Sequence, residues 1–308
     1  MSLRMPYALI NIAFGCDWKE MKKVFLTFAD GGENFIAARD RICREAKETG
    51  QFDEIRAYDW SNVSAEKIRN SPLRKCKRGC GYWIWKPDII YSVLSELADG
   101  DVLVYCDSGD VLHKAPRQWK RFFAKLSDVD MVCRRISACN VHMCRKELLE
   151  KFGGAKISCR LCYHYEMNSV FLRKTPFVMD LIAEWLAFVA DNPEEVRDVE
   201  GSVEFGRQLP SFIENRHDQS VFSLVLSKRL CDTSLKRKIK TVWEFHDGLW
   251  LWGEPCIEVA RNRGGDLIKM SFSNRIKRLA YRIMWRLHLY LERKGLCIFW
   301  EKGGYYGA

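Results

Sequence analysis

The stretch KRGCGYWIWKPDIIYSVLSELADGDVLVYCDSGDVL, residues 77–112, decides the fold class and points to a site. Its middle predicts a helix over residues 87–98, because a proline stands in the first turn, where no amide donor is lost, and a glycine ends the pattern. Residues 101–106 then predict a strand that is apolar on both faces, as in a buried parallel sheet. Asp107 and Asp110 follow, so two carboxylates come directly after a buried strand.

Strand and helix patterns alternate on both sides of this stretch. Such alternation predicts an α/β fold with a mostly parallel sheet, in which ligands bind at the carboxyl ends of the strands. Asp107 lies at such an end. The other predicted strands cover residues 23–29, 54–58, 130–133, 167–173 and 240–245. The other predicted helices cover residues 36–50, 117–126, 175–190 and 218–230, with a loop over 191–210.

The composition is that of a globular protein with an anionic partner. The 308 residues allow one large or two small domains, and an apolar fraction of 47% supplies a substantial core. A formal charge of +10 favours nucleic acid, phosphorylated small molecules or an anionic membrane surface. Eleven tryptophans are more than usual, and such rings either line ligand pockets or are buried in the core.

Thirteen cysteines without a regular spacing indicate a reducing compartment. Cys159, Cys162 and His164 would make half of a zinc site, but no second half follows at a suitable spacing. The mildly apolar start of the chain ends at Asp17, which predicts a first strand rather than a secretory leader. No run of 18 uncharged apolar residues occurs, so we expect no transmembrane helix.

The carboxylates after residues 101–106 have two interpretations. Asp107 and Asp110 at a strand end could chelate a hard divalent cation, which would neutralise a diphosphate. The sequence Asp-Ser-Gly-Asp is also ordinary turn chemistry. The neighbouring loop favours a site, because Arg78 and Lys86 could meet phosphate oxygens there. Its rings, Tyr82, Trp83 or Trp85, could stack on a base or sugar, while some of them must belong to the core.

Three further polar groups are candidates for the same site. Arg216-His217-Asp218-Gln219 precedes an apolar helix, and this run exceeds what a helix cap requires. Glu166 precedes a predicted strand and could be an acid, a base or a ligand of sugar hydroxyls. His246 follows the strand at 240–245 and could be a metal ligand, a phosphate contact or an ordinary loop residue.

The C-terminal part differs in character from the rest. Apolar residues recur at helical spacing over 276–291, and arginines and lysines surround them. Such a basic amphipathic helix suits the surface of an anionic membrane. The alternative is a final helix that packs on the domain with its basic face in solvent.

Five segments together resemble glycosyltransferases of the GT-A fold, especially bacterial enzymes that build capsule, O-antigen or lipooligosaccharide. The resemblance covers roughly residues 20–230, and its most specific parts are GYWIWKP and HDQS. The segments are KVFLTFADG, AARDRICREAKETGQFDEIRAYD, RGCGYWIWKP, DVLVYCDSGD and RHDQSVFSLVL.

The resemblance implies a nucleotide-sugar donor, by default a UDP-sugar, and a divalent cation, Mn2+ or Mg2+. In that family a DxD motif at such a strand end holds the cation, a role that falls here on Asp107. Gly109 stands where the family has its second acid, so Asp110 and His246 become the other candidate metal ligands. The catalytic candidates are Asp218, Gln219 and Glu166. The donor-binding candidates are Arg78, Tyr82, Trp85, Lys86, Asp107 and Ser108.

The fold implied by the resemblance is a GT-A-like, Rossmann-type mixed sheet, mainly parallel, with flanking helices and a C-terminal amphipathic extension. We expect a catalytic domain over residues 1–268, with a donor part at about 20–135 and an acceptor part at about 136–268. Residues 269–308 would bind the membrane. The acceptor would be a saccharide or a lipid-linked glycan, and the enzyme would lie peripherally on the cytoplasmic face of the inner membrane.

Two rival functions remain at this point. A phosphatase or phosphotransferase could use Asp107 as its nucleophile, although Gly109 stands where that chemistry normally has a second aspartate. A nucleic-acid-binding protein would fit the charge and the aromatic residues. The carboxylates would repel phosphate without a cation, however, so we expect no nucleic-acid partner.

Overall fold

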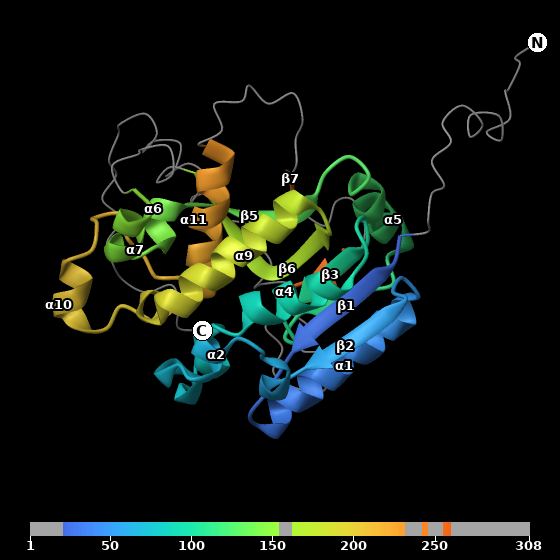
Figure 1. The fold of residues 1–308 in the computed structure, drawn as a ribbon, viewed down its shortest axis with the longest axis horizontal. Coiled ribbons are helices and arrows are strands. Elements are labelled where there is room, and N and C mark those ends of the chain that lie inside the picture. The colour runs from blue at the N-terminus through green and yellow to red at the C-terminus, as the bar shows by residue number, and fades with distance from the viewer. Residues whose placement is uncertain (1–20, 154–161, 232–241, 246–254, 260–308) are drawn as a thin grey trace, which may run out of the picture.

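The computed structural model describes residues 21–153, 162–231, 242–245 and 255–259 (Figure 1). The predictions for the N-terminal strand, Cys159, His246 and residues 269–308 therefore fall outside the described residues. The strands of the main sheet are β1 (Lys23–Phe28), β2 (Glu54–Tyr58), β3 (Val102–Cys106), β5 (Met131–Cys139), β6 (Tyr163–Arg173) and β7 (Val242–Phe245). The longer helices are α1 (Glu33–Thr49), α4 (Lys86–Glu96), α5 (Pro116–Lys125), α9 (Pro176–Asp191) and α11 (Asp218–Cys231).

Several short elements complete the described chain. The short helices are α2 (Glu66–Arg69), α3 (Gly79–Tyr82), α6 (Asn140–Met143), α7 (Lys146–Lys151) and α10 (Gly201–Gly206). The 3-10 turns are η2 (Trp60–Asn62), η3 (Pro72–Lys75) and η4 (Pro193–Val196), and β4 (Val111–Leu112) pairs with β8 (Ile257–Glu258). No helix among the described residues is long and apolar enough to cross a bilayer.

The main sheet has the strand order β2-β1-β3-β6-β5-β7. The pairs β1–β2, β1–β3 and β5–β7 are parallel, whereas β6 is antiparallel to both of its neighbours. The predicted class is confirmed: a mixed, mainly parallel sheet with helices on its faces. Because β6 runs the other way, its first half lies at the carboxyl end of β3, where Cys106 pairs with Ser169.

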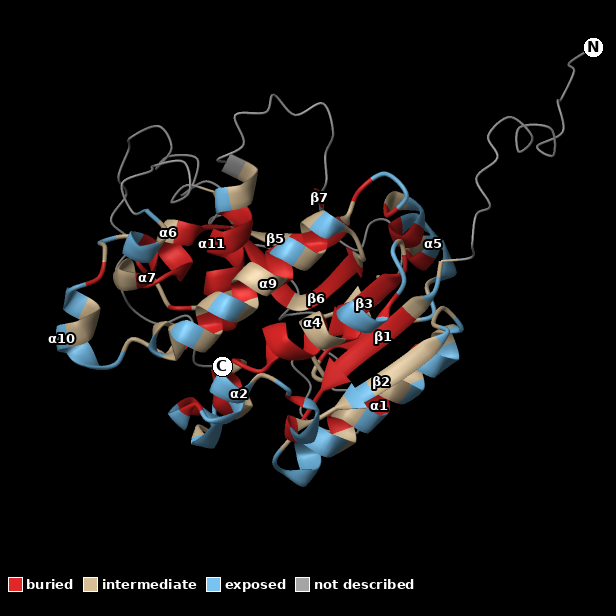
Figure 2. Cartoon of the chain, viewed as in Figure 1, coloured by how far each residue is buried: buried red, intermediate tan, exposed pale blue. Residues whose placement is uncertain are grey.

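The two faces of the sheet carry separate hydrophobic cores, because successive side chains of a strand point to opposite faces. In β3, Leu103 and Tyr105 pack with α4, α9 and α11, while Val102, Val104 and Cys106 pack with α1 and α5. Figure 2 shows the central strands buried and the covering helices striped with exposed residues. Asp107 continues the alternation, so it is expected on the face of α4 and α11.

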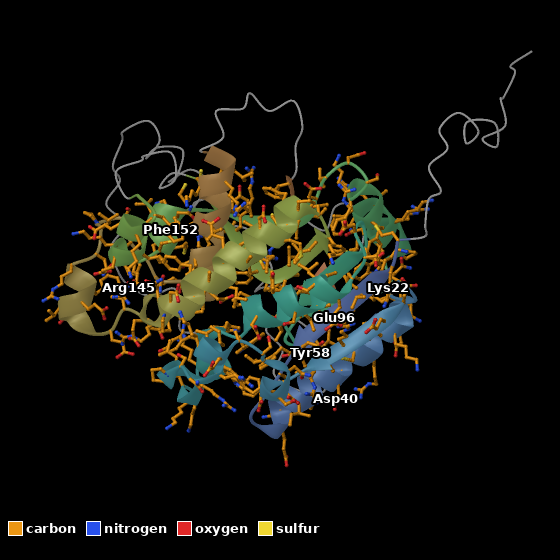
Figure 3. The ribbon with its side chains drawn as sticks, viewed as in Figure 1. Lys22, Asp40, Tyr58, Glu96, Arg145 and Phe152 are labelled. Atoms are coloured by element: carbon orange, nitrogen blue, oxygen red, sulfur yellow. The ribbon has the colours of Figure 1, made fainter. Side chains whose placement is uncertain are left out.

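One ion pair, between Arg56 and Glu96, links the edge strand β2 to α4. Arg56 donates to Glu54 and to Glu96, each at 2.6 Å, and to the hydroxyl of Tyr58 at 3.2 Å. Tyr58 and Glu96 lie beside each other in Figure 3. This contact joins the last residue of α4 to the edge of the sheet, and α4 begins with Lys86.

The sequence predictions for the first half were confirmed closely, and two predictions for the second half were wrong. The expected loop at 191–210 contains η4 and α10. Strand β6 begins at Tyr163, four residues before the predicted start, so Glu166 lies inside the strand rather than ahead of it. The polar start of β6 is extended because it pairs with β5, with Tyr165 opposite Arg135.

Candidate functional site

The turn after β3 forms the floor of the site. The amide of Asp107 donates to the carbonyl of Asn168 in β6 at 2.7 Å, and the amide of Asp110 closes the turn on the carbonyl of Asp107 at 3.0 Å. Arg41 of α1 also holds the turn, because it donates to the carbonyls of Ser108 at 3.0 Å and Asp110 at 2.9 Å. The turn is therefore built into the sheet, which positions its carboxylates.

Lys86 lies at the centre of the site and is only 3% exposed. Its ammonium is 3.0 Å from Asp107 Oδ1, 3.4 Å from Asp218 Oδ2 and 3.1 Å from the carbonyl of Met167. Burial works to lower the pKa of Lys86, but the two carboxylates outweigh it and the pKa is raised. Three acceptors thus surround a charged ammonium with three donors, and Lys86 joins the two carboxylates instead of facing solvent.

Asp218 is the first residue of α11 and is buried. Burial raises the pKa of its carboxyl group to about 7, with Asp107 adding to the shift and Lys86 opposing it. The indole of Trp185 donates to the carbonyl of Asp218 at 3.1 Å, which fixes the start of the helix. A carboxyl group that titrates near neutral pH can act as a general base or acid.

Several buried polar atoms around this point have no hydrogen-bond partner among the described residues. They are Asp110 Oδ2, Asp218 Oδ2, Gln219 Nε2 and both side-chain atoms of Asn168. Lys86 lies at ion-pair distance from Asp218 Oδ2, but without a well-aligned hydrogen bond to it. Most buried polar groups in native proteins are paired, so such a concentration indicates a place built for a polar ligand.

The remaining oxygens could hold a cation. The hydroxyl of Tyr105 donates to Asp107 Oδ1 at 2.6 Å, which leaves Oδ2 of this half-buried carboxylate for a ligand. Burial raises the pKa of Asp110 well above its ordinary value, and Asp107 adds to the effect. No group of three or more His, Cys, Asp or Glu side chains that could hold a metal ion occurs within the described ranges. The predicted third ligand, His246, lies outside them.

Glu166 belongs to a neighbouring buried ion network. It pairs with Arg134 of β5, and Arg216 Nη2 lies 3.7 Å from its other oxygen. The charges of Arg134 and Glu166 also act on the pKa of Asp110, in opposite directions, so this network lies close to the turn after β3. The structure therefore gives Glu166 two cationic partners rather than an isolated carboxylate.

The aromatic loop divides between core and surface. Trp85 is 3% exposed and stacks on Phe28 with ring centroids 3.6 Å apart, so it packs in the core. Tyr82 is buried as well, and its hydroxyl donates to Asp198 at 3.3 Å. The Arg78 side chain is 56% exposed, and its Nε lies 3.2 Å from both His217 Nε2 and Asp198 Oδ2.

The structure thus brings together Lys86, Asp107, Asp110, Asp218 and Gln219. It places Arg78 and Tyr82 in an adjacent cluster around His217, Glu166 in the ion network, and Trp85 in the core. Ser108 lies half-buried in the turn after β3.

Sequence reasoning missed Asn168 and Asp198. A polar residue inside the apolar run of β6 was a usable signal for Asn168. No local pattern marked Asp198.

No protein-family model matches the chain, and no curated protein sequence is significantly similar to it. Among solved structures, the chain is similar to galactosyltransferase LgtC in complex with donor and acceptor sugar analogues, at 15% identity and a TM-score of 0.35 over 67% of this chain and 70% of that one. Mouse xyloside xylosyltransferase 1 in its apo form matches at 10% identity and a TM-score of 0.35, over 67% and 81%.

A glycosyltransferase involved in glycosylation of the major capsid of PBCV-1 matches at 10% identity and a TM-score of 0.32, over 56% and 68%.

Proposed function

We propose that this protein is a glycosyltransferase that moves a sugar from a nucleotide-diphosphate donor, by preference a UDP-sugar, to a saccharide or lipid-linked saccharide. One observation carries the proposal. At the carboxyl end of β3 the chain gathers two linked carboxylates, a buried lysine and unpaired amide and carboxyl atoms of Asn168, Asp218 and Gln219. This set offers donors and acceptors for a polyhydroxylated ligand next to acids that suit a diphosphate and its cation.

The diphosphate end would lie at the turn after β3. Asp107 and Asp110 would hold a divalent cation, which suits carboxylate oxygens, and the unpaired Oδ2 of Asp110 fits that role. Such a cation, when bound, neutralises charge on the departing diphosphate. Arg78, in the adjacent cluster around His217, would supply a further cation to the donor, because its side chain is 56% exposed and its contacts with His217 and Asp198 engage only Nε.

The sugar end would lie at Asp218 and Gln219. Transfer breaks the bond between the anomeric carbon and the diphosphate oxygen, and the acceptor oxygen bonds to that carbon and loses its proton. A carboxyl group with a pKa of about 7 is suited to accept this proton near neutral pH. Lys86 would keep Asp218 turned toward Asp107, and the amides of Asn168 and Gln219 would bind sugar hydroxyls. Whether transfer inverts or retains the configuration is left open by this assignment.

Our proposal for the acceptor and the location rests on the sequence alone. The basic amphipathic pattern in residues 269–308 predicts a surface that attracts an anionic membrane, where lipid-linked acceptors of bacterial surface polysaccharide synthesis reside. Membrane attachment would raise the local concentration of such an acceptor. This part of the proposal is tested separately, by comparing the sedimentation of the full chain and of a chain without residues 269–308 with anionic vesicles.

The donor class is tested with nucleotide sugars. We expect one nucleotide sugar to raise the melting temperature in a cation-dependent way, and slow release of its nucleotide diphosphate to be detectable by chromatography. The variant Asp107→Asn is the control and should lose both responses. Failure of every nucleotide sugar, with or without Mn2+ or Mg2+, would refute the proposal. Labelling of Asp107 by a phosphate analogue would favour a phosphotransferase instead. Tight, salt-sensitive binding of RNA or DNA would favour a nucleic-acid-binding protein.

A further inference from the structure

The residue before Asp218 has an unusual backbone. His217 has φ of 60°, in the left-handed region, and it is buried directly ahead of α11. A residue other than glycine costs about 1 kcal/mol or more in this conformation and keeps it only where its surroundings enforce it. The φ angle of His217 also sets the direction in which the chain enters α11, and hence the position of Asp218.

Two aromatic rings hold the imidazole of His217. The ring of Trp83 stacks on it with centroids 5.1 Å apart and planes at 23°, and the ring of Tyr82 lies at 5.3 Å and 48°. Both rings come from a separate segment of the chain, which precedes α4. The imidazole is therefore clamped from outside its own helix.

The segment that supplies the rings is itself wound in the left-handed sense. The amides of Tyr82 and Trp83 donate to the carbonyls of Arg78 at 2.8 Å and Gly79 at 3.1 Å, so this turn is hydrogen-bonded. Strained backbone of this kind persists where the neighbouring structure determines it, and it concentrates at functional sites. The φ angles are 56° at Gly79, 51° at Cys80, 97° at Gly81, 54° at Tyr82 and 58° at Trp83.

Hydrogen bonds fix the charge state of the imidazole. Arg78 Nε donates to His217 Nε2 at 3.2 Å, so Nε2 carries no proton, and Nδ1 donates to the carbonyl of Val196 at 2.9 Å. Burial lowers the pKa of His217, and Arg78 adds to this, against the opposing effects of the Val196 carbonyl, Asp198 and Glu214. The imidazole is therefore neutral, with its proton on Nδ1.

The residues around the imidazole, Arg78, Tyr82, Trp83 and Asp198, form a clamp, and Asp198 contributes a third part of the chain to it. It lies 3.2 Å from Arg78 Nε and 3.7 Å from His217 Nε2, and it accepts from Tyr82. Its loop lies between η4 and α10, which Arg145 ties down through Glu204 at 2.6 Å and Glu195 at 3.7 Å. Figure 3 shows Arg145 on this side of the molecule, near α10. Arg145 therefore holds the two elements on either side of the loop that carries Asp198.

We propose that His217 is a positioning residue for Asp218: the clamp formed by Arg78, Tyr82, Trp83 and Asp198 holds His217 in its left-handed conformation, which directs Asp218 toward Lys86 and the reacting sugar. The inference rests on the proposed function for the role of Asp218. The positioning itself has a readout that needs no activity. The indole of Trp185 donates to the carbonyl of Asp218 at 3.1 Å, so its N–H resonance reports the position of Asp218.

The experiment compares His217→Ala with His217→Asn in the full chain. Asparagine adopts the left-handed region more readily than alanine, so the two variants separate the backbone conformation from loss of the ring. For His217→Ala we expect kcat to fall by about 100-fold, with the donor KM within about threefold, because misplacing a reacting group affects turnover more than binding. His217→Asn should retain about tenfold more activity than His217→Ala.

Indole 15N spectra supply the second readout. The Trp185 N–H resonance should shift in His217→Ala and shift less in His217→Asn. The indole of Trp119, bonded to the carbonyl of His113 at 2.8 Å on the other face of the sheet, is the internal control and should stay in place. An unmoved Trp185 resonance in both folded variants, or equal effects of alanine and asparagine, would overturn the proposal. If the wild type transferred no sugar, the spectra would still test whether His217 positions Asp218. Failure of the proposed glycosyltransferase function and failure of the positioning role can therefore be told apart.

Discussion

Replacing Asp218 by asparagine should stabilise the folded protein while abolishing its activity. Asp218 is buried, and Lys86 lies 3.4 Å from its Oδ2 without a well-aligned hydrogen bond, so that burial outweighs the attraction of the ammonium. A carboxyl group whose pKa is higher in the folded than in the unfolded chain destabilises the fold progressively as the pH rises between the two values. An asparagine side chain at this position would have nearly the same shape and no charge to desolvate.

The magnitude follows from the pKa of about 7, compared with an ordinary value of 3.8. At about 1.4 kcal/mol for each pH unit, the folded state loses about 4 kcal/mol between these two values. The stability difference between Asp218→Asn and the wild type should therefore grow by about 3 kcal/mol from about pH 5 to about pH 8, with little further change above that. At about pH 5 the wild-type carboxyl is protonated in the folded state, and the two proteins differ least.

Urea unfolding at a series of pH values, with both proteins at the same ionic strength, measures this difference. Asp88→Asn is a matched control: its buried carboxylate accepts from the amides of Ser64 and Ala65 at 2.6 and 3.1 Å and from the Ser64 hydroxyl at 3.0 Å. Removing a carboxylate that is fully hydrogen-bonded should destabilise the protein by about 1–3 kcal/mol. A difference between Asp218→Asn and the wild type that stays flat from about pH 5 to about pH 8 would refute the reasoning.

Three other predictions follow from the same region. Asp107→Asn should fold normally but lose turnover by at least about 100-fold, checked by circular dichroism and nucleotide release; wild-type turnover would remove Asp107 from the site. Gly79→Ala should lower the unfolding free energy by about 3 kcal/mol, because the new Cβ overlaps the Trp83 ring. Gly50→Ala, at a similar positive φ but in open space, should cost only about 1 kcal/mol; equal losses in urea unfolding would contradict this. The affinity for Mn2+ should rise with pH, because the raised pKa of Asp110 keeps a proton on it that the cation displaces. Calorimetry in two buffers of different ionisation enthalpy measures that proton release, which Asp110→Asn should reduce; undiminished proton release by Asp110→Asn would contradict this prediction.

Local patterns were sufficient for the elements and for part of the site. The proline at the start of α4, the apolar run of β3 and the alternation of the first half depend on neighbouring residues, so the sequence alone predicted them. It also predicted that Asp107 directly follows a strand, and that a helix starts within the run from Arg216 to Gln219, where α11 begins at Asp218. Both facts concern contacts between residues close in the chain.

Contacts between side chains that lie far apart in the chain could not be predicted from local sequence patterns. Lys86 was expected to meet phosphate, yet it bridges Asp107 and Asp218, which are 111 residues apart in the chain. That contact requires α4 and α11 to pack on the same face of the sheet. Local patterns also could not show which rings of the aromatic loop are buried: Trp85 stacks on Phe28 in the core and Tyr82 is buried too, whereas Trp83 is only partly buried.

By itself, the sequence determined the kinds of element, their order, and which acids stand after a strand or at the start of a helix, because periodicity and turn chemistry act over a few residues. Only the tertiary structure decided that β6 runs antiparallel beside β3, which brings Asn168 to the carboxyl end of that strand. It also decided the charge states of Lys86 and Asp218, since a pKa depends on burial and on charges that distant segments supply.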